Sequence, residues 1–476
     1  MLFKRVFIFF SLIVFFQKLA ASELNLSEKI SNKKYISIVF ASNNLRSVAS
    51  IFGHTFLVFH NEELPELDSI ALDFLAQSEE ENFSQGKAFF YKVKANYRVR
   101  NYLDKKNEYD FEDRDLFIYT LNLKNSEKED IVKVVLQSLN QDYYYNFNSF
   151  NCAFYIYKIL SDANLTQKMS PFLYTLPINT IRTLEKNKLI ASYRIDYSSQ
   201  SLFKSAYDQL SSTEKALVEE YLRLRSSPEN HLNTKMESAL NYGVNYLALH
   251  ENNIYKRDEL LKLKRKFAKS NNNLPQLMNP LEKNGETSIA LSINPINKSQ
   301  SIEIKPGLRD FKTNYSDGLM SSYFEILKLK GSRKQYSFNL DSIVFIKVNN
   351  FVSEKIYNQS LNSYLEFSWD KVVSPGYLLS FGLGQSMNIS NFNFGIKPVI
   401  ALKHNHSLNF LFGGLFNIQI SLWGNNLLES EFNLLNSEAI LKNNLSIEIS
   451  SRYRFFVSHQ KSKINELLDL GLVYLF

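Results

Sequence analysis

The hydrophobic pattern at the start of the chain is that of an export signal. Within residues 1–22, the charged Lys4 and Arg5 lie near the start, an almost wholly apolar run from Val6 to Phe16 follows, and small residues lie at the end. This order is typical of a secretory signal peptide, and the run is shorter than the roughly 20 apolar residues that a membrane-spanning helix needs. We therefore expect residues 1–22 to direct export. An uncleaved membrane anchor is the alternative interpretation.

A period of two dominates the other end of the chain. The alternate apolar positions there are Leu468, Leu470, Leu472, Tyr474 and Phe476. Because alternate side chains of a strand point to the same side, this pattern predicts a strand with one uniformly apolar face. A terminal strand that ends on Phe is similar to the last strand of Gram-negative outer-membrane barrels. An ordinary buried strand would show the same alternation.

Short apolar segments separated by Asn, Ser, Gly and Lys fill the region before this strand. The predicted strands are Ser288–Ile293, Ser301–Lys305, Tyr323–Lys330, Tyr336–Leu340, Ser342–Val348, Tyr364–Trp369, Leu378–Gly384, Phe394–Leu402, Leu408–Phe412, Phe416–Trp423 and Leu445–Tyr453. Transmembrane barrel strands need about 9–11 residues, so the region has room for roughly 10 to 12 of them. We predict an antiparallel transmembrane-type β-barrel over residues 285–476. A soluble β-sandwich or a soluble periplasmic barrel is the competing interpretation.

The middle of the chain mixes strand and helix patterns. The predicted elements of residues 35–198 are strands at Tyr35–Ala41, His54–Phe59 and Ser69–Leu75 and an amphipathic helix at Ser126–Asn140. These periodicities predict an α+β domain. Residues 199–270 predict a helical connector of three helices, which are Leu202–Gln209, Ser212–Leu224 and Asn233–Leu263.

Composition and motifs exclude several classes of function. The net charge of +7 is spread along the chain, and no basic run indicates a nucleic-acid partner. The sequence has no Cys/His spacing suited to zinc, no glycine-rich phosphate loop and no GxSxG motif. We therefore expect no metal and no cofactor.

Cys152 is the only cysteine of the chain, so it cannot form an internal disulfide. In an exported protein such a thiol is buried and inert, paired with another molecule, or reactive. The cap-forming Asn151 precedes it and an apolar run follows, which predicts that Cys152 lies in the first turn of a helix. The partial positive charge and free N–H groups at a helix N-terminus favour the thiolate and can bind an oxyanion.

His54 is the best candidate base among the seven histidines, because it begins a predicted buried strand directly after Gly53. A cysteine at a helix end facing a histidine on a strand is the geometry of papain-like thiol enzymes, here with the histidine first in the chain. Asp73, on the next predicted strand, is the candidate to orient the imidazole, and His60 is an alternative. Asn151 and Gly53 are assigned to substrate or oxyanion binding, although Asn151 could orient His54 or simply cap the helix. A core cysteine and a structural histidine remain the non-catalytic interpretation.

Several motifs in one order resemble the Lnb N-terminal periplasmic domain family, an exported bacterial family. The motifs are Gly53–Leu57, Ile70–Phe74, Glu112–Leu121, Tyr145–Phe147 with Asn151-Cys152, and Pro177–Arg182. The resemblance covers roughly residues 35–200 and implies a periplasmic domain ahead of an outer-membrane barrel region. The His-then-Cys order is also similar to permuted NlpC-type papain-like hydrolases and acyltransferases, which implies amide, ester or thioester chemistry at acyl groups. The family position that matches Asp73 is more often Asn, so the carboxylate is a departure.

We therefore predict an outer-membrane protein with a periplasmic thiol hydrolase or acyltransferase domain. Cys152 is the predicted nucleophile, His54 the base and Asp73 the orienting group. The expected partners are outer-membrane lipid, the barrel-assembly machinery through the strand ending in Phe476, and an envelope lipid, lipoprotein or peptidoglycan substrate, with no nucleic acid. A non-catalytic binding or assembly module attached to the barrel is the alternative function.

Overall fold

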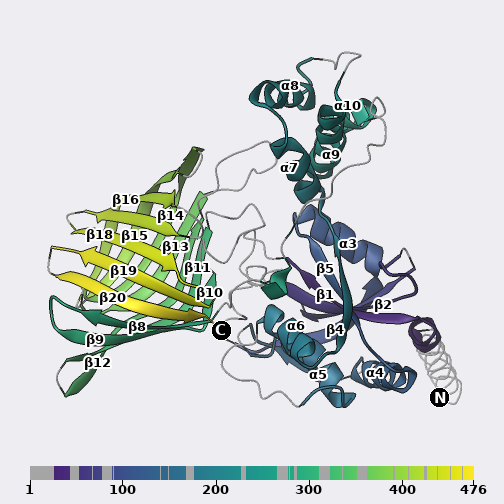
Figure 1. The fold of residues 1–476 in the computed structure, drawn as a ribbon, viewed down its shortest axis with the longest axis horizontal. Helices are drawn as coiled ribbons and strands as arrows, with labels where there is room; N and C mark the ends of the chain where they lie inside the picture. The colour runs from purple at the N-terminus through teal and green to yellow at the C-terminus, as the bar shows by residue number, and fades with distance from the viewer. Residues whose placement is uncertain are drawn as a thin grey trace, which may run out of the picture. The chain divides into compact units, whose positions relative to one another are not determined.

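The chain forms two compact units that divide between residues 272 and 273 (Figure 1). The computed structural model describes residues 26–42, 53–66, 68–77, 88, 91–139, 141–147, 149–167, 176–226, 232–264, 277, 279–282, 287–309, 322–334, 336–350, 362–372, 374–389, 392–405, 407–422, 426–436, 438–450, 452–463 and 465–475. The predicted signal peptide and Phe476 lie outside the described residues.

The centre of the first unit is a seven-stranded antiparallel sheet in the order β6-β4-β3-β2-β1-β5-β7. Its strands are β1 Tyr35–Ala41, β2 His54–His60, β3 Ile70–Ala76, β4 Val93–Asn101, β5 Leu116–Leu121, β6 Tyr143–Tyr145 and β7 Ile190–Asp196. The apolar strands β1, β2 and β5 are buried along most of their length, since helices cover both faces of the sheet.

Helices from different parts of the chain cover the two faces (Figure 1). The helices are α3 Tyr102–Phe111, α4 Asn125–Ser138, α5 Cys152–Asp162 and α6 Pro177–Lys186. On one face Tyr102 and Tyr109 of α3 pack with Phe56 and Val58 of β2. On the other face Tyr155 of α5 stacks on Phe74 of β3 with ring centroids 3.9 Å apart.

Four further helices form a cluster within the first unit (Figure 1). They are α7 Ser199–Asp208, α8 Ser212–Leu222, α9 Thr234–His250 and α10 Ile254–Lys264, and α9 packs against the other three. The predicted single helix Asn233–Leu263 is wrong, because the backbone is extended at Glu251 and Asn253 caps a new helix by accepting a hydrogen bond from Lys256 N–H at 3.2 Å.

Carboxylates near β5 attach this helical cluster to the sheet domain. Asp115 accepts hydrogen bonds from the backbone N–H of Ser198 at 2.8 Å and the hydroxyl of Ser201 at 2.7 Å. His250 Nε2 lies 2.9 Å from Asp113 Oδ1. The cluster is therefore fixed to the domain by buried and half-buried polar contacts.

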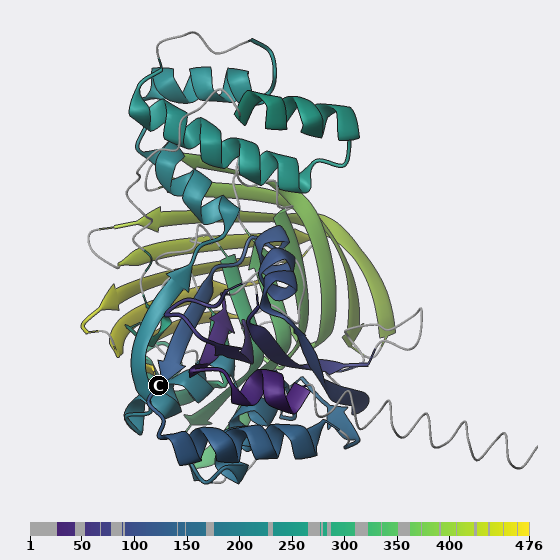
Figure 2. The same ribbon diagram turned by 90° about the vertical axis from the view of Figure 1, so that its right-hand side faces the viewer.

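The second unit is a closed antiparallel barrel (Figure 2). Its twelve wall strands are β8 Ser288–Asn294, β9 Ser299–Lys305, β11 Ser322–Lys334, β12 Ser337–Asn350, β13 Asn362–Asp370, β14 Gly376–Ile389, β15 Phe392–Asn405, β16 Ser407–Ser421, β17 Leu427–Leu435, β18 Glu438–Glu448, β19 Tyr453–Lys461 and β20 Glu466–Leu475. Each pairs with its neighbour, and pairing of β9 with β11 closes the ring. The short β10 (Gly307–Arg309) also pairs with β11.

The observed strands confirm the predicted barrel and correct several of its elements. Two pairs of predicted strands are each part of one continuous strand. Tyr336–Leu340 and Ser342–Val348 fall on β12, which begins at Ser337, and Leu408–Phe412 and Phe416–Trp423 fall on β16, which ends at Ser421; Trp423 lies outside the described residues. The predicted strand Leu445–Tyr453 is wrong, because a turn follows Glu448 and Tyr453 begins β19. Strand β17 was not predicted, since Glu429, Ser430 and Glu431 interrupt its apolar pattern.

The barrel is apolar outside and polar inside. On β14 the exposed side chains include Leu379, Phe381 and Leu383, whereas the alternate Leu378 and Ser380 face inward. The predicted apolar face of the last strand is likewise outward, because Asp469 and its parity partners line the interior. This alternation is that of a transmembrane barrel. No helix among the described residues has the length and apolar content needed to cross a membrane.

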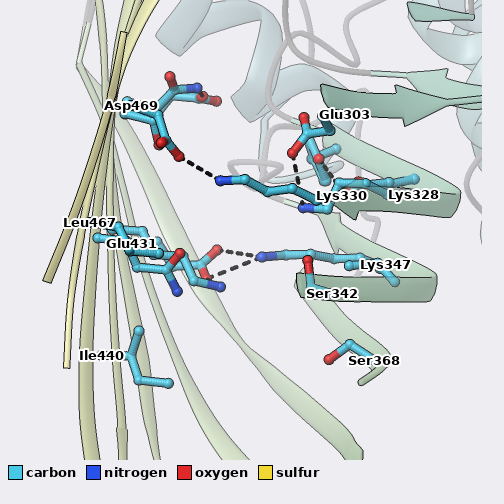
Figure 3. Close-up of a pocket in the computed structure, with 18 of the residues that line it drawn as sticks. Glu303, Lys328, Lys330, Ser342, Lys347, Ser368, Glu431, Ile440, Leu467 and Asp469 are labelled. Atoms are coloured by element: carbon cyan, nitrogen blue, oxygen red, sulfur yellow. Dashed lines mark hydrogen bonds and ion pairs between the residues drawn. The ribbon is translucent and has the colours of Figure 1, made fainter. Parts of the chain in front are cut away.

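Ion pairs occupy the barrel interior (Figure 3). Lys347 of β12 reaches Glu431 of β17 at 2.9 Å, and Lys330 of β11 pairs with Asp469 of β20. These strands are not neighbours in the wall, so the side chains meet within the lumen. A cavity of about 320 Å³ lies among them.

Candidate active site

Cys152 begins α5, as the sequence predicts. The Asn151 side chain accepts a hydrogen bond from Phe154 N–H at 3.1 Å, and its amide donates to the Phe147 carbonyl at 3.0 Å. Asn151 therefore caps the helix and holds the preceding turn. The cap places the Cys152 thiol at the positive end of the helix, where 3% of the residue is exposed.

Gly53 lets the chain enter β2 tightly beside β1. Its φ is +84°, and a Cβ at this position would lie 2.5 Å from the Phe40 ring and 2.8 Å from the Ala41 carbonyl oxygen. Any other residue would meet both strain and a steric clash. The glycine thus allows His54 to begin the strand opposite Ala41.

The site lies where β2 and β3 separate. The two strands pair only at residues 57–59 with 70–72, so His54 and Asp73 extend beyond their paired region. His54 and Asp73 share strand parity with Phe56 and Ala71, which pack in the cluster that contains Tyr109 of α3. Helix α5 contacts β2 and β3 from the face of Phe74. The thiol and the imidazole therefore come from opposite sides of the sheet and meet at this gap.

The contacts run from thiol to imidazole to carboxylate. Cys152 lies close enough to the His54 side chain and to the Thr55 backbone N–H for both to lower the pKa of its thiol. His54 Nε2 lies 2.6 Å from Asp73 Oδ1, which leaves Nδ1 as the ring atom available to the sulfur. The structure thus brings together three residues that span 98 positions of the sequence.

The electrostatics of the group favour a thiolate–imidazolium pair. Burial raises the pKa of the Cys152 thiol, but the His54 charge and hydrogen bond outweigh it, and the net pKa is lowered. Burial lowers the pKa of His54, but the neighbouring Cys152, Tyr109 and Asp73 reverse this effect and hold the pKa of His54 well above its ordinary value. Burial also raises the pKa of Asp73, yet His54 and Lys105 hold it below its usual range. A lowered thiol pKa is what a nucleophilic cysteine needs.

The predicted alternative orienting group, His60, lies away from the site. His60, at the far end of β2, contacts the Ser37 hydroxyl at 2.7 Å and the Glu62 carbonyl oxygen at 2.7 Å, so it is not the orienting group. Burial lowers the pKa of His60, as expected of a neutral structural histidine. The second carboxylate–histidine pair of the first unit, His250 with Asp113, joins α9 to the segment before β5.

No sequence pattern distinguishes the remaining members of the site. Lys105 of α3 lies 2.8 Å from Asp73 Oδ2, and both side chains are fully buried. Burial raises the pKa of Tyr145 well above its ordinary value, and the negative charges of the nearby Cys152 and Asp73 raise it further. Lys105 and Lys106 are adjacent in a polar helix, so the sequence does not show which of them is buried; the packing of α3 on the sheet buries Lys105.

Comparisons with known proteins give one family match, which lies in the first unit. Residues 25–187 match the Lnb N-terminal periplasmic domain family. Solved structures similar to this chain include the outer membrane protein OmpT of Vibrio cholerae in a form lacking loop L8, with 8% identity and a TM-score of 0.20, covering 40% of this chain and 97% of that one. Two mutant porins of Rh. blastica show 11% identity and TM-scores of 0.18, covering 40% of this chain and 99% of theirs. No curated protein matches the chain.

A periplasmic domain joined to a closed barrel with an apolar outer face identifies the location of the protein. The protein belongs to the outer membrane, and its barrel associates with membrane lipid.

Proposed function

We propose that the protein is a membrane-anchored thiol hydrolase or acyltransferase, because residues 25–187 match the Lnb N-terminal periplasmic domain family and a closed barrel follows them in the chain. Its substrate is an amide, ester or thioester of the cell envelope. The observation that carries the proposal is the ion pair of His54 Nε2 with Asp73 Oδ1 at 2.6 Å, in an imidazole close enough to Cys152 to lower the pKa of its thiol.

The first half of the reaction transfers an acyl group to sulfur. The Cys152 thiolate attacks the acyl carbon, and the carbonyl π electrons move to oxygen. The backbone N–H groups of Cys152 and Ala153 in the first turn of α5 stabilise this oxyanion. When the intermediate collapses, the bond to the leaving group breaks and the His54 imidazolium protonates the departing alcohol, amine or thiol. The product is a thioester on Cys152.

The second half releases the acyl group. Water, or an acceptor amine or alcohol in the transferase, attacks the thioester carbon and gives its proton to neutral His54. Collapse expels the Cys152 thiolate and restores the thiolate–imidazolium pair. Asp73 keeps the imidazole oriented and stabilises its charged form throughout.

The location of the domain restricts its substrates and partners. Phospholipid acyl groups, lipoprotein acyl groups and peptidoglycan peptides all carry suitable carbonyl carbons in the envelope. We propose that the last strand, β20, engages the barrel-assembly machinery during insertion. Asp73 supplies a full negative charge to His54.

Acyl-enzyme formation tests the proposal. The full chain in detergent is incubated with a short-chain 4-nitrophenyl ester, and intact mass and peptide mapping follow the acyl group. We expect acylation at Cys152 that Cys152→Ala abolishes and His54→Ala lowers by about 100-fold or more, the scale of a general base. His250→Ala is the matched control, because it removes a histidine paired with a carboxylate that contacts no thiol in the described structure.

The opposite outcome is equally clear. A wild-type thiol that remains unacylated and resists alkylation until the protein unfolds would contradict the proposal and favour the non-catalytic binding module. In cells, an envelope whose lipids, acyl-proteins and muropeptides are unchanged by Cys152→Ala would have the same meaning.

A further inference from the structure

Lys105 is a buried cation that the proposed reaction does not yet use. Its Nζ lies 2.8 Å from Asp73 Oδ2 and 3.0 Å from Glu108 Oε1, and its side chain has no exposed surface. The amine also lies over the Tyr109 ring, 4.5 Å from its centroid. Burial of a lysine is unfavourable unless it is paired, and an apolar side chain would fill the same space at lower cost.

The two oxygens of Asp73 have separate partners. Oδ1 faces His54 and Oδ2 faces Lys105, so rotation of the carboxylate would break one contact or both. The lysine comes from α3, whereas the carboxylate comes from β3 and the imidazole from β2. Helix α3 is therefore tied to the reacting group through a single carboxylate.

We propose that Lys105 is a positioning residue for the Cys152–His54 pair and that it acts through Asp73. The inference rests on the proposed function. The lysine holds the carboxylate charged and fixed in the direction of His54, and the carboxylate in turn fixes the imidazole against the sulfur. Lys105 extends the contact series of thiol, imidazole and carboxylate by one member.

The charges around this series set the direction of the expected effect. The groups that face it are Asp73, His54, Cys152, Tyr145, Glu108, Tyr109, Arg114 and, through Glu108, Arg100. Loss of Lys105 removes the partner that holds Asp73 Oδ2 in place, so the carboxylate can rotate away from His54. The imidazolium is then held less firmly near the sulfur, and the pKa of the Cys152 thiol rises in the variant.

The test compares two adjacent lysines of one helix. The rate of Cys152 alkylation by iodoacetamide is measured from pH 5 to 10 in full-length wild type, Lys105→Met and Lys106→Met. We expect Lys105→Met to move the midpoint to higher pH and to lower acylation by the 4-nitrophenyl ester about tenfold or more, as loss of an orienting outer group does at metal sites. Lys106, which pairs with Asp196 at the surface, is the matched control and its variant should match wild type.

A second variant separates charge from folding. Lys105→Gln keeps an N–H donor for Asp73 and removes only the charge, so it should show the same shift if the cation matters. An alkylation profile identical to wild type in folded Lys105→Gln or Lys105→Met would overturn the inference, as would failure of both variants to fold, which would assign a purely structural role. Failure of the proposed function differs, because the wild-type thiol itself would then be unreactive.

Discussion

Asp73 is the residue at which the charges of the candidate site converge. It is fully buried between one imidazole and one ammonium group, each at hydrogen-bonding distance. A second His–Asp pair, His250 with Asp113, has similar geometry but lies at the attachment of α9. The distinction between the two pairs is the thiol next to His54, which no local sequence pattern around Asp73 or Asp113 reveals.

Acid stability should depend on Asp73. Its pKa is lower in the folded protein than the unfolded value of about 3.9, so its stabilisation is complete above that value and is lost as the pH falls below it. We expect hydrogen exchange of the β2 and β3 amides in the full chain to accelerate as the pH falls from about 5 towards 2, after correction for intrinsic rates.

Asp73→Asn provides the comparison. It should lower the free energy of local unfolding by up to about 3–5 kcal/mol at pH 7, because it removes one of the two carboxylates that pair with buried Lys105 and leaves only the half-exposed Glu108. It should also flatten the acid dependence. An unchanged acid dependence in Asp73→Asn would show that other carboxylates determine the acid sensitivity of this region.

At the scale of elements, the site is a product of where strands and helices begin. The sequence allowed prediction of the N-terminus of α5, since Asn151 precedes an apolar run, and of the start of β2 after Gly53. It did not allow prediction of the gap between β2 and β3, which depends on long-range pairing. The split of Asn233–Leu263 into α9 and α10 was missed because apolar residues continue at helical spacing across the Asn252-Asn253 break.

The capping role of Asn151 can be separated from oxyanion binding. Asn151→Ala should destabilise the first unit by about 0.5–2 kcal/mol, whereas Asn151→Ser should recover most of this loss because serine also caps helices. The stabilities of wild type and both variants are measured by thermal unfolding, followed by the α-helical circular dichroism signal. The ester assay should then show near wild-type acylation in Asn151→Ser. A stable Asn151→Ser protein with acylation lowered more than about 100-fold would instead assign the side chain to the oxyanion site.

At the scale of the whole molecule, the outer part of the barrel was predictable and its interior was not. Alternation along β14 and β20 specifies which side chains face lipid, because a strand has a fixed period of two. The partners of the inward charges depend on barrel closure and register. Lys347 meets Glu366 of the neighbouring strand and Glu431 of a distant one, and no sequence spacing relates these three residues.

The cross-lumen ion pairs predict that the barrel is an anchor and not an open pore. In planar lipid bilayers the full-length wild type should show no steady porin-like conductance, because Lys347 links β12 to β17 and Lys330 links β11 to β20 across the interior (Figure 3). Lys347→Gln removes the cation that Glu366 and Glu431 share, so repulsion between these carboxylates should produce cation-selective openings. The control is Lys334→Gln, which removes the same charge from the exposed end of β11. A large wild-type conductance that Lys347→Gln leaves unchanged would contradict the prediction and support a channel function for the barrel.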